Sequence, residues 1–371
     1  MIYPIQIAEL ILDRFSMTPS GTHLPTSHRP LGRSGVAVPS ISFGTSCLGN
    51  LYEAVVAERK LAIVREILQH SPTPVVLDSA GKYGAGLALE VIGASLRKLR
   101  VPAEQVIISN KLGWYRVPLR GPEPTFERGV WAGIGHDAES QISYDGILKC
   151  YEQGNELLGV GYPSQLVSVH DPDEYLATAK TRAERTQRFA DVLGAYRALF
   201  ELKRAGKVAA VGIGSKDWRV IREIADQVPL DWVMFACSLT VYSHPPELLA
   251  FIAELHARGV GIINSAVFNA GFLTGGAWFD YRKPDPVQDA ALFQWRDKFL
   301  ATCRKFAVKP ADVCVQFGLA LPGVVSVALN TGKPERIAEN VASASNPIPT
   351  ELWRELKDLG LVNRSFPIGN N

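Results

Sequence analysis

The 371-residue chain lacks paired cysteines, clustered metal ligands and long apolar runs. Its cysteines are odd in number, widely spaced and without a CxxC pair, which favours reduced thiols over disulfides. They are Cys47, Cys150, Cys237, Cys303 and Cys314. His136 and Asp137 stand alone in a glycine-rich stretch, and no His or Cys cluster has zinc-ligand spacing, so we expect no metal site.

An excess of charge of one sign is also missing, since 39 basic residues face 37 acidic ones. This balance argues against a nucleic acid or an anionic membrane as partner and favours a small-molecule substrate. The sequence contains no run of about 18 uncharged apolar residues, so it predicts no membrane span. Residues 1–20 do not resemble a signal peptide, because Glu9 and Asp13 interrupt their apolar part. We therefore expect a cytoplasmic protein, and the composition leaves its oligomeric state open.

What the chain does contain is a regular succession of short apolar runs, typical of strands buried on both faces. The eight runs are Ile41 to Gly44, Val75 to Asp78, Val106 to Asn110, Leu166 to His170, Ala209 to Gly214, Trp232 to Cys237, Val260 to Asn264 and Val324 to Leu329. Helix-like segments lie between them: Glu58 to Gln69, Ala88 to Leu99, Gly146 to Leu158, Phe189 to Ala205, Val220 to Gln227, Glu247 to Arg258 and Leu292 to Phe306.

Eight strand and helix units over roughly 300 residues predict an α/β fold, the (β/α)8 TIM barrel. The rival is a doubly wound nucleotide-binding sheet. It is disfavoured because no strand is followed by GxGxxG opening a helix, and Gly212, Gly214 and Ser215 supply only half of that pattern.

Three segments stand outside this alternation. Residues 1–28 form an N-terminal extension with one possible helix at Ile5 to Phe15, and residues 29–371 hold the barrel. Arg29 to Ile41 predicts a hairpin that caps the bottom of the barrel. Trp114 to Tyr144, rich in Gly and Pro, is interpreted as a long loop over the mouth of the barrel, where such loops shape substrate choice. Trp114, Tyr115 and Trp131 in it suit either an aromatic wall against substrate or simple loop packing.

Four polar residues follow consecutive strands at the end where barrel enzymes place their active sites. Asp78 ends the second strand, Tyr83 lies in the next loop, and Lys111 and His170 end the third and fourth strands. Taken singly, each suits a structural role: a helix cap, a packed ring, a solvated lysine or a rim histidine. Their conjunction favours a catalytic site.

The chemistry that these residues suit is proton transfer to and from a carbonyl oxygen. Tyr83 would donate the proton in reduction and accept it in oxidation. We expect the Lys111 ammonium to favour the phenolate, Asp78 to hold the lysine, and a neutral His170 to orient the substrate oxygen or share the proton transfer.

Together these motifs resemble the aldo-keto reductase family over nearly all of Arg29 to Ser345. Asp78, Tyr83, Lys111 and His170 match its catalytic tetrad in order and local context, and residues 29–45 are similar to its opening hairpin and first strand. The resemblance implies a barrel that binds NAD or NADP without a Rossmann fold. The cofactor-binding residues that it implies are Gly214, Ser215, Phe268, Asn269, Gly271, Leu273, Asn330, Thr331, Arg336, Glu339 and Asn340.

Residues 264–275 depart from the common family pattern and resemble its sugar-oxidising branch, which includes D-threo-aldose, L-fucose and L-galactose dehydrogenases and a pyridoxal dehydrogenase. That likeness implies oxidation of an aldose at C1 to the lactone, with Tyr83 as the base. Two alternatives stay open. One is reduction of small aldehydes or ketones with NADPH, and the other is a regulatory subunit that binds the cofactor without rapid turnover.

The cofactor loop after the eighth strand favours NAD over NADP. Asn330 and Thr331 stand where NADP-preferring relatives often carry a Lys or Arg and a Ser, and a 2′-phosphate needs a cationic partner. Lys333 and Arg336 are close enough in sequence to serve, or are solvated charges at a helix start. After the sixth strand, Cys237 and its neighbours replace the family's usual Gln, so no nicotinamide contact is assigned there.

Overall fold

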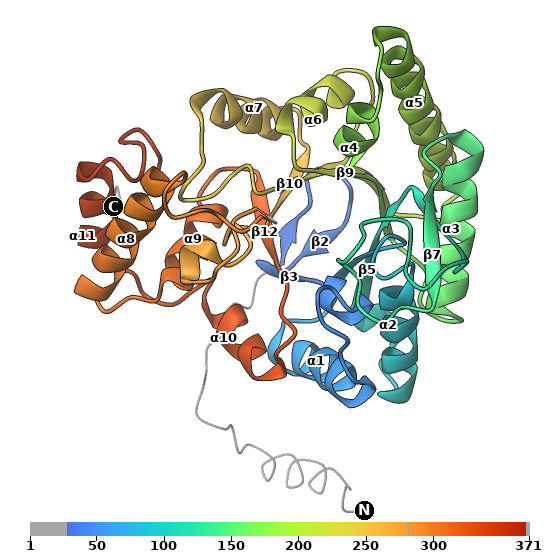
Figure 1. Ribbon diagram of the computed structural model, residues 1–371, viewed down its shortest axis with the longest axis horizontal. Coiled ribbons are helices and arrows are strands. Elements are labelled where there is room, and N and C mark those ends of the chain that lie inside the picture. The colour runs from blue at the N-terminus through green and yellow to red at the C-terminus, as the bar shows by residue number, and fades with distance from the viewer. Residues whose placement is uncertain (1–27, 281, 369–371) are drawn as a thin grey trace, which may run out of the picture.

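The computed structural model describes residues 28–280 and 282–368 (Figure 1). The helix expected at Ile5 to Phe15 lies outside these residues. Within the described chain, no helix combines the length and the apolar content that crossing a membrane requires. Nor does this part of the chain bring together three His, Cys, Asp or Glu side chains as a possible metal site.

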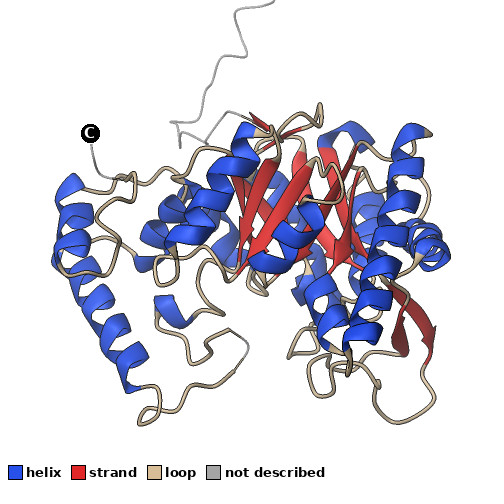
Figure 2. Cartoon of the chain, turned by 90° about the horizontal axis from the view of Figure 1, so that it is seen from above, coloured by secondary structure: helices blue, strands red, loops and turns tan. Residues whose placement is uncertain are grey.

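Eight parallel strands close into a barrel, which confirms the predicted fold. All eight expected runs form its strands: β3 (Ile41–Gly44), β4 (Val75–Ala80), β5 (Val106–Leu112), β8 (Leu166–His170), β9 (Ala210–Ser215), β10 (Trp232–Ala236), β11 (Gly261–Ser265) and β12 (Val324–Leu329). The pairing of β12 with β3 closes the ring. Figure 2 shows these strands with helices packed around them.

The seven expected helices are present, with most ends shifted by one or two residues and the start of α5 seven residues earlier than expected. They are α1 (Ala57–His70), α2 (Leu87–Lys98), α3 (Tyr144–Leu158), α5 (Arg182–Arg204), α6 (Trp218–Ala225), α7 (Pro246–Ala257) and α8 (Ala290–Lys305). Four further helices are α4 (Pro172–Ala177), α9 (Pro310–Leu319), α10 (Ile337–Ala342) and α11 (Thr350–Asp358). The α9 segment lacks a clear periodicity because apolar residues cover most of its circumference.

The expected hairpin consists of β1 (Arg29–Pro30) and β2 (Ala37–Val38), which pair antiparallel. Leu31 and Val38 are buried against residues that begin the barrel strands, among them Val76 and Leu166. The Arg33 amide donates to the carbonyl of Gly259 at 2.9 Å, just before β11. The hairpin therefore closes the N-terminal end of the barrel and leaves the C-terminal end as the open mouth.

The prediction that Trp114 to Tyr144 is only a loop is wrong in part. Its two ends form the antiparallel strands β6 (Trp114–Pro118) and β7 (His136–Ser140), which stand away from the barrel in Figure 2. The intervening residues 119–135 remain irregular. Neither strand alternates buried and exposed residues, because the first four residues of β6 are all half-buried.

Candidate active site

Strand pleating determines which side chains point into the mouth of the barrel. Val76, Ile107, Leu166 and Ala210 belong to the cluster that packs on the hairpin inside the barrel. Side chains two or four residues further along each strand share that face. The inward positions at the mouth are therefore Gly44, Asp78, Lys111, His170, Gly214, Ala236 and Ser265. Three neighbouring strands carry large polar groups there, and the opposite half of the rim carries only small residues.

Asp78 and Lys111 form a buried ion pair between neighbouring strands. The Lys111 Nζ donates to Asp78 Oδ2 at 2.5 Å, and the Ser109 hydroxyl donates to the other carboxylate oxygen at 2.9 Å. Both residues are no more than 4% exposed. The expectation that Asp78 holds the lysine is in agreement with this geometry.

Tyr83 reaches the mouth from the loop after β4. Its ring lies edge-on to the His170 ring at 5.6 Å between centroids, and the Lys111 ammonium lies 4.9 Å from its centroid. The backbone around Tyr83 packs without space against the preceding loop, since a Cβ on Gly84 would lie 2.3 Å from the Gly49 carbonyl oxygen. Gly84 also has φ +61°, so only glycine fits this turn without strain. The loop is thereby fixed, and Tyr83 with it.

The effect of Lys111 on the ionisation of Tyr83 stays a prediction, although the ammonium does lie next to the Tyr83 ring. Burial raises the pKa of Tyr83 well above its ordinary value, and the carboxylates of Asp78 and Asp171 raise it further. Asp78 neutralises the lysine that was expected to lower it. The tyrosine is therefore a protonated hydrogen-bond donor at neutral pH.

His170 is neutral, as expected. Burial lowers its pKa well below the ordinary value, and the nearby ammonium groups of Lys111, Lys82 and Lys216 act in the same direction. Its Nδ1 is buried and has no hydrogen-bond partner among the described residues. The other ring nitrogen, Nε2, lies 3.5 Å from Asp171 Oδ2.

A cluster of charges beside His170 was not anticipated. Lys82 is 3% exposed, and its Nζ lies 2.8 Å from both Glu127 and Glu174 and 3.5 Å from Asp171. Although burial acts to lower the pKa of Lys82, these three carboxylates raise it overall. The residues come from two loops and from α4 with its N-cap, so no local motif marks them in the sequence.

An aromatic wall adjoins Tyr83 on the side of the long loop. Trp131 lies 5.9 Å from the Tyr83 ring, and Phe126 packs between Trp131 and Trp114. Trp114 and Trp131 thus lie where a wall against substrate was considered, and Phe126 was missed. Tyr115 lies outside this cluster and packs on the main core.

The half of the rim opposite Asp78, Lys111 and His170 carries only small side chains. Gly214 lies beside the polar half, where an added Cβ would come within 3.1 Å of Lys111 Cδ. Gly214 and Ser215, expected to contact the cofactor, both end β9. A larger residue at position 214 would therefore crowd the Lys111 side chain.

The expected cofactor residues after β11 lie in a tight loop with open space beside it. Gly271 has φ +91° and no atom within 4 Å of an added Cβ, whereas Leu273 is fully buried. Asn269 donates to Asp280 at 3.0 Å, and its Oδ1 is buried without a hydrogen-bond partner in the described chain. Phe268 is half-buried against the core.

A hollow of about 360 Å³ adjoins this loop and was not foreseen. Arg296 of α8 lines it and lies over the rings of Phe272 and Phe293, at 4.3 and 4.8 Å from their centroids. Lys283 also lines the hollow. Both cations make the hollow suited to an anionic group.

The remaining expected cofactor residues lie after β12, at its mouth end. Asn330 donates to the Ser46 hydroxyl at 2.9 Å, and the Thr331 hydroxyl accepts from the Lys333 amide at 3.2 Å. Arg336, Glu339 and Asn340 follow in the turn η4 (Pro334–Arg336) and in α10. Glu339 is paired with Lys309 at 2.5 Å, so its carboxylate is already engaged.

Cys237 follows β10, at the place where many relatives carry Gln. Its backbone is left-handed, with a φ of +60°. Burial and the neighbouring Asp280 raise the pKa of its thiol, so it is a neutral group.

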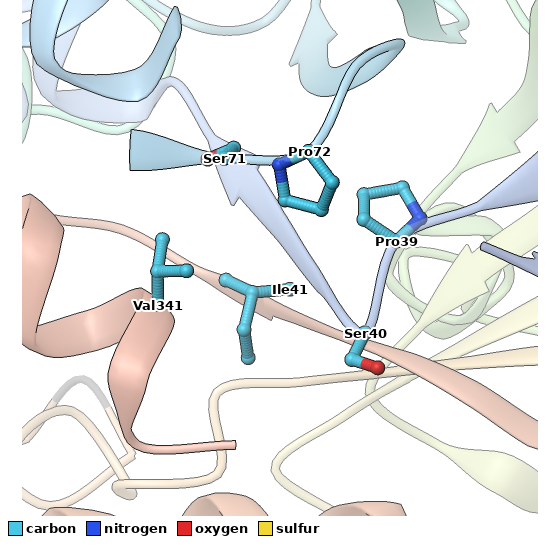
Figure 3. A pocket seen from close by; sticks show the side chains of 6 residues that line it. All are labelled: Pro39, Ser40, Ile41, Ser71, Pro72 and Val341. Atoms are coloured by element: carbon cyan, nitrogen blue, oxygen red, sulfur yellow. The ribbon is translucent and has the colours of Figure 1, made fainter. Parts of the chain in front are cut away.

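At the opposite end of the barrel a small hollow lies between the start of β3 and α10 (Figure 3). Pro39, Ser40, Ile41, Ser71, Pro72 and Val341 line it. None of these side chains is titratable, so the chemistry belongs to the mouth.

Comparison with known proteins agrees with this placement. The model of the aldo/keto reductase family matches residues 40–360. Pyridoxal 4-dehydrogenase from Microbacterium luteolum is 28% identical over 92% of this chain and its own full length. D-threo-aldose 1-dehydrogenase from a Pseudomonas species is 26% identical, over 89% of this chain and 96% of its own.

The fold is also shared with solved structures. An aldo-keto reductase from Bacillus halodurans in its holo form superposes with a TM-score of 0.65 at 19% identity. The match covers 92% of this chain and 99% of that one. At this identity the likeness concerns the barrel alone.

Proposed function

The chain belongs to the aldo/keto reductase family of NAD(P)-dependent oxidoreductases, and we propose that it oxidises an aldose at C1 to the lactone with the tetrad Asp78, Tyr83, Lys111 and His170. The observation that carries this proposal is the polar half of the rim, where all four side chains meet beside a half lined by small residues. The relatives that act on a threo-aldose and on pyridoxal support an oxidative role.

The bound cofactor supplies the hydride acceptor, and the chain supplies position and proton transfer. Gly214, Ser215, the loop with Asn269 and Gly271, and the segment from Asn330 to Asn340 would hold the cofactor. Tyr83 donates a hydrogen bond to the substrate oxygen, because its raised pKa keeps the phenol protonated. His170 faces the same oxygen as a neutral ring. Lys111 pairs with Asp78 and lies over the face of the Tyr83 ring, which it helps to orient.

We infer a preference for NAD. Asn330 and Thr331 are uncharged and are engaged in local hydrogen bonds, and Glu339 brings a carboxylate to the same segment. A 2′-phosphate would need a cation here. Replacing Asn330 with Lys, at an exposed position, should raise kcat/KM for NADP about tenfold while leaving NAD turnover within threefold.

Reduction of a small aldehyde or ketone is the second candidate. A protonated Tyr83 favours it, because reduction needs a proton donor for the oxygen.

One assay, which follows absorbance at the reduced-nicotinamide band, distinguishes the aldose dehydrogenase from the aldehyde or ketone reductase. Purified protein is mixed with L-fucose, L-galactose, D-arabinose or pyridoxal and either NAD or NADP, and separately with simple aldehydes and NADH or NADPH. Formation of reduced cofactor with a sugar, absent in Tyr83→Phe, supports the aldose dehydrogenase. No absorbance change with any sugar, together with consumption of NADPH with aldehydes, would support the reductase instead. Tight cofactor binding with no turnover of any substrate would instead support a regulatory subunit.

A further inference from the structure

Lys82 contacts two separate segments of the chain through their carboxylates. Its Nζ lies 2.8 Å from Glu127 of the irregular segment 119–135, the outer loop, and 2.8 Å from Glu174 of α4. Lys82 is buried, so its ammonium is shielded from water. Charge-assisted contacts are stronger in such surroundings than at the surface. Because Lys82 directly precedes Tyr83 in the chain, its pairing with Glu127 fixes the outer loop beside that tyrosine.

Glu127 uses both of its carboxylate oxygens. Oε1 pairs with Lys82, and Oε2 accepts a hydrogen bond from the Trp131 indole N–H at 2.8 Å. The backbone of Glu127 is left-handed, with φ +42°, a conformation that is costly for a residue with a Cβ. Such a conformation persists where the surrounding contacts outweigh its cost. The two side-chain contacts of Glu127 supply part of that compensation.

Trp131, which donates to Glu127, packs against the Tyr83 ring. The two ring centroids are 5.9 Å apart, and Trp131 is 6% exposed. His170 and the Lys111 ammonium also lie near the Tyr83 ring, at 5.6 and 4.9 Å from its centroid. A movement of Trp131 would therefore remove one of the contacts that orient the tyrosine.

We propose that Glu127 is a positioning residue that clamps the outer loop to Lys82 and thereby holds Trp131 against Tyr83. Glu127 acts through Trp131 and takes no part in the transfer of hydride or proton. The inference rests on the proposed function in one respect, that Tyr83 is the residue that serves the substrate oxygen. Because the clamp places the Tyr83 hydroxyl, its loss should lower kcat more than it raises KM.

The aromatic cluster of the outer loop offers a rival explanation. Phe126 packs between Trp131 and Trp114, and these rings bury apolar surface without any contribution from charge. If that packing alone fixes Trp131, the carboxylate of Glu127 is dispensable. Variants that change Glu127 and keep the aromatic rings distinguish the two explanations.

Two replacements of Glu127 remove the clamp in steps. Glu127→Gln removes the charge that faces Lys82, while its amide oxygen can still accept from the Trp131 indole. Glu127→Ala removes both contacts. In either variant Lys82 keeps Asp171 at 3.5 Å and Glu174 at 2.8 Å, so the buried ammonium retains counter-ions and the chain should fold. The matched control is Glu174→Gln, which takes a carboxylate from Lys82 at the same distance but lies on α4.

Three measurements on the full-length protein follow the clamp. Hydrogen–deuterium exchange with mass spectrometry reports opening of the outer loop. Carbon-13 NMR of tyrosine-labelled protein reports the surroundings of the Tyr83 ring, whose signal is assigned with Tyr83→Phe. Steady-state kinetics give kcat and KM for L-fucose, L-galactose, D-arabinose and pyridoxal with NAD, and for simple aldehydes with NADPH.

We expect the outer loop to exchange about tenfold faster in Glu127→Ala than in wild type, because a hydrogen bond and an ion pair are lost. Glu127→Gln should lie between the two, and Glu174→Gln should exchange as wild type does. In Glu127→Ala the Tyr83 signal should shift, and kcat should fall about tenfold while KM stays within about threefold. Wild-type exchange or an unshifted Tyr83 signal in Glu127→Ala would overturn the inference, as would equally fast exchange in Glu174→Gln.

The exchange and NMR measurements need no substrate, so the two proposals fail separately. A protein that oxidises none of these sugars but shows a loop and a Tyr83 signal that depend on Glu127 would remove the aldose assignment and support the clamp. Turnover of a sugar, with exchange and a Tyr83 signal that are independent of Glu127, would do the reverse.

Discussion

Lys111 and Asp78 form a buried ion pair, with 2.5 Å between Nζ and Oδ2, directly beneath the face of the Tyr83 ring. A lysine held in this way keeps its charge inside the barrel, where a lone ammonium would be costly. The pair therefore positions Tyr83 electrostatically without ionising it.

Breaking this pair should destabilise the protein. Asp78→Asn leaves the Lys111 charge buried without its counter-ion, and we expect the free energy of unfolding to fall by about 3–5 kcal/mol. Urea denaturation followed by circular dichroism measures this. The double variant with Lys111→Met should recover part of the loss, since no buried charge remains. Equal stability of wild type and Asp78→Asn would contradict the importance of the pair.

Tyr83 should act as an acid across the physiological range. Because its pKa lies well above the ordinary value, reduction of an aldehyde at saturating NADH should not lose rate between pH 7 and 9. Tyr83→Phe should lower kcat by about 10²- to 10⁴-fold while retaining cofactor affinity, measured by quenching of tryptophan fluorescence. A fall in the wild-type rate with an apparent pKa below 9 would show that the phenol ionises readily.

Gly84 should be essential for placing Tyr83. A methyl group on it would meet the Gly49 carbonyl oxygen at 2.3 Å, so the two loops must separate. We expect Gly84→Ala to cost about 1–3 kcal/mol of stability and to lower kcat more than it raises KM. Gly129→Ala is the matched control, since that glycine also has a positive φ but no atom within 4 Å of an added Cβ. Similar kinetics of the two variants would refute the special role of Gly84.

The buried Asp171 should cost stability at neutral pH. Its pKa is about 6 in the folded chain against 3.8 for the free group, so the folded state binds the proton more tightly. Stability therefore falls as pH rises from about 4 to 6, by roughly 3 kcal/mol at most. Asp171→Asn should accordingly gain stability relative to wild type between pH 4 and pH 7. The measurement is the free energy of unfolding of both proteins in urea. A difference between variant and wild type that stays constant, or narrows, from pH 4 to pH 7 would disprove the raised pKa.

Much of the barrel was predictable because its strands are buried on both faces and appear as separate apolar runs. Ile41 to Gly44 and Val324 to Leu329 begin and end as expected. The β6 and β7 strands were missed because they pair only with each other and carry no alternation. Their conformation depends on packing against α3, which the local sequence does not reveal.

The candidate site, like the fold, was predictable only in part. Asp78, Lys111 and His170 were predictable because they end consecutive strands, whose C-terminal ends share one face of a barrel. Lys82 and Asp171 were not, since their roles depend on loop contacts with Glu127 and Glu174 and on a left-handed turn. The sequence also does not show that Tyr83 is buried, which raises the pKa of its phenol.

The central claim is hydride transfer from C1 of an aldose at the four-residue site. The most direct test uses L-fucose, L-galactose and D-arabinose deuterated at C1, incubated with NAD and the wild-type protein. The account predicts deuterium in the reduced nicotinamide, a lactone product and slower turnover than with the unlabelled sugar. Reduced cofactor without deuterium, or no reduced cofactor with any of the three sugars, would contradict it.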